Sequence, residues 1–338
     1  MFLHLIVYFV ILKKLGTISL MLTVVATSAN VDFDAIIQKV NSVGASWKAG
    51  LPTITASSII GQYCAWKSPS KPTKISLHIN SVIPEEFDSR ERWPYCPTIR
   101  SIRNQGKCGS CWAVAAASTL SDRLCIATNG SFTLPLSENE IISCCKECGS
   151  GCHGGFHDKA WQYLVTHGIV TGGGYLSHVG CQPYEIPPCE RVPSNSSRPN
   201  CQSLPVPQTP QCRTTCTNSF YNVSYSSDHR RLLNQYQLPN NTLEIQKEIL
   251  TNGPVEAAIS VYSDFLTYHS GIYHHLTTKE VSRHAVKIIG WGSEGDVPFW
   301  LVANTFDTDW GEGGFFRILR GSNECGIEDD VTGGTPLV

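Results

Sequence analysis

Two apolar runs open the chain, over residues 1–12 and 15–26, and Lys13-Lys14 separates them. Each run is shorter than the roughly 20 apolar residues that a membrane-spanning helix needs. Because the second run ends in small residues, the pattern predicts a cleaved signal peptide over 1–29 and no stable membrane insertion. The alternative is a signal anchor over 1–26, which would hold both lysines inside the membrane at a cost of about 2.5–3.5 kcal/mol each.

Helical and extended hydrophobic patterns divide the rest of the chain into two unequal halves. Apolar residues at helical spacing predict helices over 31–43, 111–127 and 157–167. β-rich runs between Gly-rich turns predict strands over 255–261, 284–292, 298–304 and 314–320. The sequence therefore predicts an α+β fold with a helix-rich half at about 95–230 and a strand-rich half after it.

Charge and cysteine content narrow the class of protein. The 338 residues carry a formal net charge of −2 without a basic stripe, so we expect no nucleic-acid partner. Fifteen cysteines, dense between 96 and 216, indicate an oxidising secretory route. Four glycosylation sequons agree with that route, at Asn129, Asn195, Asn222 and Asn240.

Two cysteine pairs have the spacing of a metal or redox site, Cys108-x-x-Cys111 and Cys145-x-x-Cys148. No His pair follows at zinc-finger spacing, so we expect neither a metal nor a cofactor.

The segment 105–112, Gln-Gly-Lys-Cys-Gly-Ser-Cys-Trp, carries a candidate nucleophile at Cys111. A thiol with its ordinary pKa of about 8.5 is mostly protonated, and a helix N-terminus with an imidazolium partner makes it a thiolate. Gly109 and Ser110 form a cap-like lead into the helix predicted from Cys111, which places the sulfur at the positive end of the helix dipole. The amide of Gln105 is a candidate donor to an oxyanion, alongside the Cys111 backbone N–H.

This motif resembles that of the papain family of cysteine proteases, in which a His and an Asn follow far downstream. His284 and Asn304 stand in matching segments, 284–292 and 300–306. A Cys- and Pro-rich insertion over 181–216 resembles the occluding loop of the cathepsin B-like members, here about 186–206. The match runs from about residue 45 to the C-terminus. It implies a two-lobed fold, with a helical left domain, a β-barrel-like right domain and the active-site cleft between them.

The resemblance also implies the catalytic roles. His284 pairs with the Cys111 thiolate and protonates the leaving amine, and Asn304 orients the imidazole. Family members usually have Ser-Trp after this Asn, whereas Thr305-Phe306 stands here, so we expect reduced shielding of the Asn–His hydrogen bond. We expect five other histidines at the surface or in loops: His153, His157, His269, His274 and His275.

Further positions match the substrate subsites of the family. Gly154 and Gly155 resemble the glycine pair that lets a substrate backbone approach the S1 wall. Asp330 stands where cathepsin B-like enzymes have a Glu at the floor of the S2 pocket, which implies tolerance of a basic P2 residue. Arg283 replaces a glycine at the rim of S2 or of the primed side, and Trp310 would line S1′.

The implied disulfide framework uses twelve of the cysteines and leaves Cys111 and Cys325 as free thiols. Fourteen cysteines of the expected mature region are an even number, so one reactive thiol requires a second unpaired one. The implied pairs are Cys96–Cys125, Cys108–Cys152, Cys144–Cys212, Cys145–Cys148, Cys181–Cys216 and Cys189–Cys201.

Residues 30–82 resemble a short propeptide, and residues 83–338 would form the mature peptidase domain. Trp47 and Cys64 mark inhibitory positions of the family's propeptides, and the polar stretch 67–74 suits cleavage. The alternative is a disordered tail, but the apolar face over 31–43 needs a surface to cover.

The occluding loop departs from the family at the residues that give carboxydipeptidase activity. Arg191 and Val192 replace two adjacent histidines, and Asn104 replaces the Asp that latches the first of them. The Arg198–Asp309 latch is kept, as are Cys189 and Cys201. We therefore expect a loop anchored on one side only and weakened or lost release of C-terminal dipeptides.

The sequence is thus interpreted as a cysteine endopeptidase made as a zymogen, secreted or lysosomal, that acts as a monomer on peptides or proteins. Its own propeptide and cystatin-type proteins are the expected inhibitors. Two alternatives remain: a catalytically silent relative that acts as a binding protein, and a disulfide-rich adhesive glycoprotein.

Overall fold

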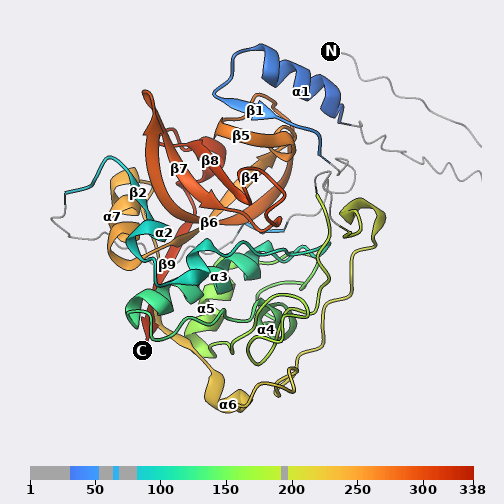
Figure 1. Ribbon diagram of the computed structural model, residues 1–338, viewed down its shortest axis with the longest axis vertical. Helices are drawn as coiled ribbons and strands as arrows, with labels where there is room; N and C mark the ends of the chain where they lie inside the picture. Colours follow the sequence, from blue (N-terminus) through green and yellow to red (C-terminus); the bar gives the residue numbers. More distant parts are fainter. Residues whose placement is uncertain (1–30, 53–63, 68–81, 192–196) are drawn as a thin grey trace, which may run out of the picture. The chain divides into compact units, whose positions relative to one another are not determined.

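A long buried helix, α3 (Cys111–Ala127), lies between a helical half and a sheet half in the computed structural model (Figure 1). The structure describes residues 31–52, 64–67, 82–191 and 197–338, so the expected signal peptide lies outside the described residues. All residues of α3 from Cys111 to Cys125 are buried, because its alanines let neighbours approach on every side. Helices α4 (Glu138–Cys144) and α5 (His157–Thr166) contact α3 on one side, and the sheet contacts it on the other.

The sheet half is an open nine-stranded sheet. Its order is β1-β5-β8-β7-β6-β4-β9-β3, with β2 paired to β6. Only the β5–β8 pair is parallel among these pairings of the described strands. The strands are β1 (Trp47–Ala49), β2 (Phe87–Asp88), β3 (Arg231–Gln237), β4 (Val255–Tyr262), β5 (Tyr268–Tyr273), β6 (Glu280–Glu294), β7 (Val297–Ala303), β8 (Phe315–Leu319) and β9 (Val331–Leu337). The expected barrel-like closure is therefore wrong, because β1 and β3 end the sheet instead of pairing with each other.

The remaining helices are short and lie around these two halves. They are α1 (Phe33–Ser42), α2 (Ser89–Arg92), α6 (Tyr225–Asp228) and α7 (Thr242–Asn252), with 3-10 turns η2 (Pro97–Arg100), η3 (Cys201–Ser203), η4 (Phe265–Thr267) and η5 (Glu324–Gly326). Asp32 caps α1 by accepting from the Ala35 N–H, and Asn241 caps α7 in the same way. Among the described residues, no helix has the length and apolar character to cross a membrane.

Two buried ion pairs connect α3 with the sheet half. Arg123 donates to Glu248 of α7 at 2.6 Å, and Lys287 of β6 donates to Asp122 at 2.6 Å. All four side chains are almost fully buried. Removing one partner of such a pair leaves an uncompensated buried charge, so these contacts fix how the two halves meet.

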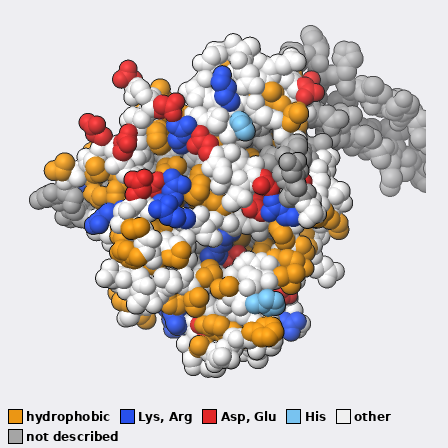
Figure 2. Space-filling model, in the orientation of Figure 1, with side chains coloured by type: hydrophobic (Ala, Val, Ile, Leu, Met, Phe, Trp, Pro, Cys, Tyr) orange, Lys and Arg blue, Asp and Glu red, His pale blue; other side chains and the backbone are white. Residues whose placement is uncertain are grey.

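Basic and acidic side chains are interspersed on the face shown in Figure 2. The helices predicted over 31–43, 111–127 and 157–167 are confirmed as α1, α3 and α5, and the four predicted strands as β4, β6, β7 and β8.

Candidate active site

Cys111 is the first residue of α3 and has no exposed surface. Its position at the helix N-terminus is the one that the motif predicts. Ser110 precedes the helix but makes no side-chain cap, because its hydroxyl bonds the Tyr184 hydroxyl at 2.7 Å instead. The cap-like role expected for Ser110 is therefore wrong, since its side chain does not cap α3.

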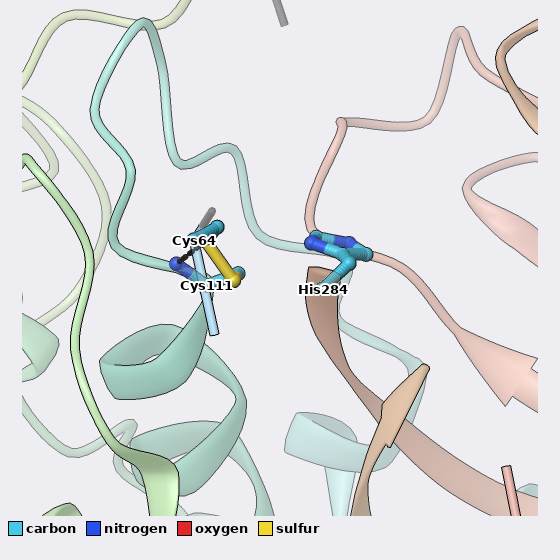
Figure 3. A group of neighbouring side chains, drawn as sticks. All are labelled: Cys64, Cys111 and His284. Carbon is cyan, nitrogen blue, oxygen red and sulfur yellow. Dashed lines mark hydrogen bonds between the residues drawn. A yellow bond between two sulfur atoms is a disulfide. The ribbon is translucent and has the colours of Figure 1, made fainter. Parts of the chain in front are cut away.

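Cys111 is joined by a disulfide bond to Cys64 of the expected propeptide (Figure 3). The expectation of a free thiol at Cys111 is thus wrong for this form of the protein. The parity argument counted only the cysteines after residue 83, and Cys64 lies before them. Within the described residues, Cys325 is the one cysteine without a disulfide partner.

The sulfur of Cys64 occupies the place where two candidate oxyanion donors converge. The Cys111 N–H donates to Cys64 Sγ at 2.7 Å, and Gln105 Nε2 donates to the same atom at 3.8 Å. The Gln105 amide cannot turn freely, since its Oε1 accepts from Thr305 Oγ1 at 2.5 Å and its Nε2 also donates to the Cys108 carbonyl at 2.7 Å. Two N–H donors aimed at one buried atom are the arrangement that stabilises an oxyanion.

His284 of β6 faces this sulfur pair from the sheet half (Figure 3). One of its ring nitrogens lies within 4.8 Å of both sulfur atoms. Its Nε2 donates to Asn304 Oδ1 at 2.8 Å, so the proton of the neutral ring sits on Nε2. Burial lowers the pKa of His284 to about 4, with the Arg191 charge adding to this effect and the Asn304 hydrogen bond opposing it. The imidazole is therefore neutral here, where no thiolate is present to stabilise its cation.

Phe306 covers the His284–Asn304 hydrogen bond. Its ring stacks on the His284 ring with centroids 4.7 Å apart, and the Arg191 guanidinium lies 4.4 Å from the Phe306 centroid. Phe306 and His284 are both nearly fully buried. The Phe306 ring thus covers the His284–Asn304 hydrogen bond with less area than an indole would, but the Arg191 guanidinium lies against this ring.

The segment 64–66 crosses the site as an extended chain. Trp66 N donates to the Gly155 carbonyl at 2.7 Å, and Gly155 N donates to the Cys64 carbonyl at 3.2 Å. Ala65 N donates to the Arg283 carbonyl at 3.2 Å. A Cβ at Gly155 would lie 2.6 Å from the Trp112 ring, so only glycine permits this approach. Gly154 has φ +105°, which also favours glycine.

The expected subsite residues lie at different depths. Asp330 lies 3.7 Å from the guanidinium of Arg283, the residue whose carbonyl accepts from Ala65 N. Trp310 is fully buried among Phe265, Tyr268 and Phe316, so its role at S1′ stays a prediction.

His157 is a functional candidate that the sequence did not reveal. It is fully buried, which contradicts its expected place at the surface, and its Nε2 lies 3.1 Å from Asp330 Oδ2. The pairing depends on a carboxylate from far along the chain, so local sequence carries no signal for it.

The occluding loop is attached to the body on both sides, contrary to the expected single anchor. Asn104 Nδ2 donates to the Cys189 carbonyl at 3.3 Å, and Arg191 Nη2 donates to the Gly106 carbonyl at 2.6 Å. Hydrogen bonds to two backbone carbonyls thus stand in place of the lost ion pair on this side. Val192 and Asn195 lie outside the described residues.

The other side of the loop is held by the expected Arg198–Asp309 ion pair and by one further carboxylate. Arg198 pairs with both Asp307 and Asp309. Burial alone would raise the pKa of Asp307, but bonds from Asn104 and the Thr308 backbone, with the Arg198 charge, hold it below its usual value.

The other disulfides have the six pairings that the family resemblance implies, Cys96–Cys125, Cys108–Cys152, Cys144–Cys212, Cys145–Cys148, Cys181–Cys216 and Cys189–Cys201. The sequon residues Asn129, Asn222 and Asn240 are exposed, and their glycosylation stays a prediction.

Two groups of described side chains have the spacing of metal ligands. In the first, Cys64 and Cys111 are engaged in their disulfide beside His284. In the second, Glu324 Oε1 already accepts from His275 Nδ1 at 2.6 Å and from Cys325 Sγ at 3.2 Å.

Comparisons with known proteins agree with this site. The sequence model of the papain family of cysteine proteases matches residues 83–335. Over 311 residues the chain is 45% identical to the cathepsin B-like cysteine proteinase 4 of Caenorhabditis elegans, which covers 90% of this chain and 92% of that protein. Over 268 residues it is 47% identical to a cathepsin B-like cysteine proteinase of Schistosoma japonicum, covering 79% of this chain and 78% of that one.

Solved structures of precursor forms share the fold. The procathepsin B S9 of Trypanosoma congolense is 37% identical with a TM-score of 0.75, covering 90% of this chain and 98% of that one. A digestive procathepsin L2 of Tenebrio molitor, 23% identical, matches with a TM-score of 0.69 over 90% of this chain and 88% of that one. With a papain-family match over most of its length and cathepsin B-like relatives of this identity, the chain belongs to the papain family of cysteine proteases, among its cathepsin B-like peptidases.

Proposed function

We propose that this peptidase is an endopeptidase in which Cys111 is the nucleophile and His284, Asn304 and Gln105 complete the catalytic set. One observation carries the proposal: the Cys111 N–H and Gln105 Nε2 both donate to a single atom beside the His284–Asn304 pair. In a substrate complex the carbonyl oxygen takes the place that Cys64 Sγ has here.

The mechanism follows from these positions. Once Cys111 is a thiol and the segment 64–66 has left, His284 takes its proton and the thiolate attacks the carbonyl carbon. The oxygen becomes an oxyanion held by the Cys111 N–H and Gln105, where one such donor contributes roughly 10²–10³ in rate. His284 then protonates the leaving amine, and it later removes a proton from the water that hydrolyses the thioester. Asn304 holds the orientation of the imidazole through all of these steps.

We propose that release of C-terminal dipeptides is weakened. A group that receives a terminal carboxylate needs a free cation in the cleft. The guanidinium of Arg191 is instead buried, donates to the Gly106 carbonyl and lies on Phe306. Burial lowers the pKa of Arg191 to about 10, yet it remains charged at neutral pH.

We further propose that the chain is made as a zymogen for a secreted or lysosomal destination and acts as a monomer. Residues 30–82 would be the inhibitory propeptide, residues 83–338 the mature domain, and cystatin-type proteins further inhibitors. The support is the pairing of the segment 64–66 with Gly155 and Arg283, which excludes a substrate from the same backbone groups.

The test of the proposed function is hydrolysis of a dipeptide-coumarin with Leu at P2 and Arg at P1, after propeptide removal under reducing conditions. We expect Cys111→Ala to abolish activity and Asn304→Ala to lose less, because an orienting residue leaves partial geometry behind. Full activity in Cys111→Ala would exclude this nucleophile.

The dipeptidase proposal is tested with one peptide as a free acid and as an amide. We expect similar rates for the two. In Asn104→Asp combined with Arg191→His and Val192→His, we expect a preference for the free acid. A strong preference in the unmodified enzyme would contradict the proposal.

A further inference from the structure

Three side chains with metal-ligand chemistry meet outside the catalytic site. His275 lies just after β5, and Glu324 and Cys325 belong to η5. An imidazole nitrogen, a carboxylate oxygen and the thiol sulfur of these residues lie within 4.8 Å of one another. We call this group the His275–Glu324–Cys325 cluster. Histidine, glutamate and cysteine are the residue types that bind zinc in proteins, so the cluster has the composition of a zinc site.

One oxygen of Glu324 connects the cluster. Its Oε1 accepts from His275 Nδ1 at 2.6 Å, from the His275 backbone N–H at 3.0 Å and from Cys325 Sγ at 3.2 Å. Glu324 and Cys325 are both buried. Two exchangeable protons, on the imidazole and on the thiol, thus point at one carboxylate, and metal binding releases protons from ligands of this kind. The backbone N–H would keep the carboxylate oriented toward a bound ion.

The three ligand atoms need only a small shift to hold zinc. With tetrahedral bonds of about 2.0–2.3 Å, neighbouring ligand atoms of a zinc ion lie roughly 3.3–3.7 Å apart. The nitrogen–oxygen and sulfur–oxygen distances of 2.6 and 3.2 Å must therefore open by less than about 1 Å. The His275 side chain is 37% exposed, so it has room to move outward. Its open side also gives the ion a route in and leaves a place for water as the fourth ligand.

Contacts around the cluster hold the imidazole in place. The Asp264 carboxylate accepts from the backbone N–H groups of Leu276 at 2.5 Å and Thr277 at 3.1 Å. These bonds fix the segment that carries His275. The Tyr262 ring stacks on the His275 ring, with centroids 4.2 Å apart. Supporting contacts of this kind set the orientation of metal-binding histidines.

The backbone at Cys325 adds an independent observation. Its φ is +53°, a conformation that residues other than glycine seldom adopt. Such conformations are costly and are concentrated at functional sites. Burial, with the Glu324 charge, raises the pKa of the Cys325 thiol. The thiol therefore keeps its proton until a metal ion displaces it.

We propose that His275, Glu324 and Cys325 bind a zinc ion at a site separate from the catalytic centre. The thiol releases its proton to solvent and binds as thiolate, and the neutral imidazole binds through Nδ1 with its proton on Nε2. The ion would tie η5 to the segment that follows β5. The expectation of no metal rested on the spacing of Cys-x-x-Cys pairs, which does not bear on His275 and Glu324, 49 residues apart.

The test titrates the unreduced, untagged precursor with Co²⁺, a spectroscopic substitute for zinc, and then with Zn²⁺. Fourteen of the fifteen cysteines form disulfides, so Cys325 is the one thiol of this form. We expect a sulfur-to-cobalt charge-transfer band that saturates at one ion per chain and disappears when zinc is added. Cys325→Ser should lack the band, and Glu324→Gln should bind cobalt at least about tenfold more weakly.

His274→Gln is the matched control. This neighbouring imidazole bonds Ser46 instead of the cluster, so the variant should bind cobalt like the wild type. Cys64→Ser combined with Cys111→Ser keeps Cys325 as the one thiol whatever the redox state of the catalytic cysteine, and it should show the same band. Absence of the band from the wild type or from this double variant overturns the proposal, as does an equal band in Cys325→Ser.

Thermal unfolding gives a second readout that does not depend on cobalt. An ion that binds only the folded state raises Tm. Zinc should therefore raise Tm of the wild type and of His274→Gln but leave that of Cys325→Ser unchanged. An equal rise in Cys325→Ser overturns the proposal. Neither measurement uses peptidase activity, so both stand whether or not the proposed function holds.

Discussion

Replacing Cys64 by Ser tests how the precursor is kept inactive. The disulfide with Cys111 closes a loop with a sequence separation of 47 residues. The chain-entropy relation gives about 4 kcal/mol for a loop of this length. Among the described residues, three backbone hydrogen bonds also hold the segment 64–66, with Trp66, Gly155 and Ala65 as donors, at about 1 kcal/mol each. Loss of the disulfide should thus open the cleft roughly 10³-fold more often.

The assay is labelling of the unprocessed precursor with an epoxide that alkylates the active-site thiol. Without reductant, we expect no labelling of the wild-type precursor and clear labelling of Cys64→Ser. A small thiol should activate the wild type: its thiolate attacks one sulfur, a second thiol resolves the mixed disulfide, and Cys64 and Cys111 become thiols while the reductant is oxidised. Cys325→Ser is the matched control, since this buried cysteine makes no disulfide, and it should behave as the wild type.

The result that refutes the reasoning is stoichiometric labelling of Cys111 in unreduced wild-type precursor. Peptide mapping without reduction gives an independent check, because a fragment that joins Cys64 to Cys111 should appear before the thiol is added and disappear after it.

Three further predictions concern the site and its support. Thr305→Val removes the hydroxyl that donates to Gln105 Oε1 at 2.5 Å and holds this amide in place. In steady-state kinetics, kcat should fall about tenfold while KM changes little. Equal changes in kcat and KM would contradict this role of Thr305. Gly155→Ala places a Cβ 2.6 Å from an indole ring and should lower stability by about 1–3 kcal/mol in urea unfolding, whereas Gly174→Ala, with open space around it, should be neutral. Burial raises the pKa of Glu256 to about 8 from an ordinary value of 4.5, so the folded state holds an extra proton and stability should fall as pH rises from about 4.5 through 8. Tm measured across this range should flatten in Glu256→Gln, and an unchanged slope would show that this group is not the cause.

The candidate catalytic residues could be predicted from the sequence because the proposed chemistry fixes their residue types. A thiolate, its imidazole partner and the orienting amide each leave a local signature at Cys111, His284 and Asn304. The disulfide partner of Cys111 was not predicted, because the cysteine count covered only the expected mature domain and left out Cys64. The burial of His157 could not be predicted for a different reason. It depends on a contact with Asp330, which is distant in the sequence and is brought close only by the fold.

Two strands without a strong hydrophobic pattern, β3 and β9, were also not predicted from the sequence. β9 contains two glycines and a proline, and β3 is largely polar, so neither shows a strong extended pattern. They are strands because they pair with each other, and β9 also with β4, at the end of the sheet. Strands with strong patterns, such as β4 and β7, needed no such tertiary support to be predicted.

The edge strand β1 has a consequence for the enzyme after activation. β1 comes from the expected propeptide and pairs with β5, where a Cβ on Gly271 would lie 2.5 Å from the Ser46 carbonyl. Gly271 thus permits the close approach of β1, and its φ of +96° also favours glycine by itself. Release of the expected propeptide would leave β5 as the outer strand, with unpaired backbone groups that face water. Activation of this kind would expose, away from the candidate catalytic centre, a strand edge to which another extended chain can pair.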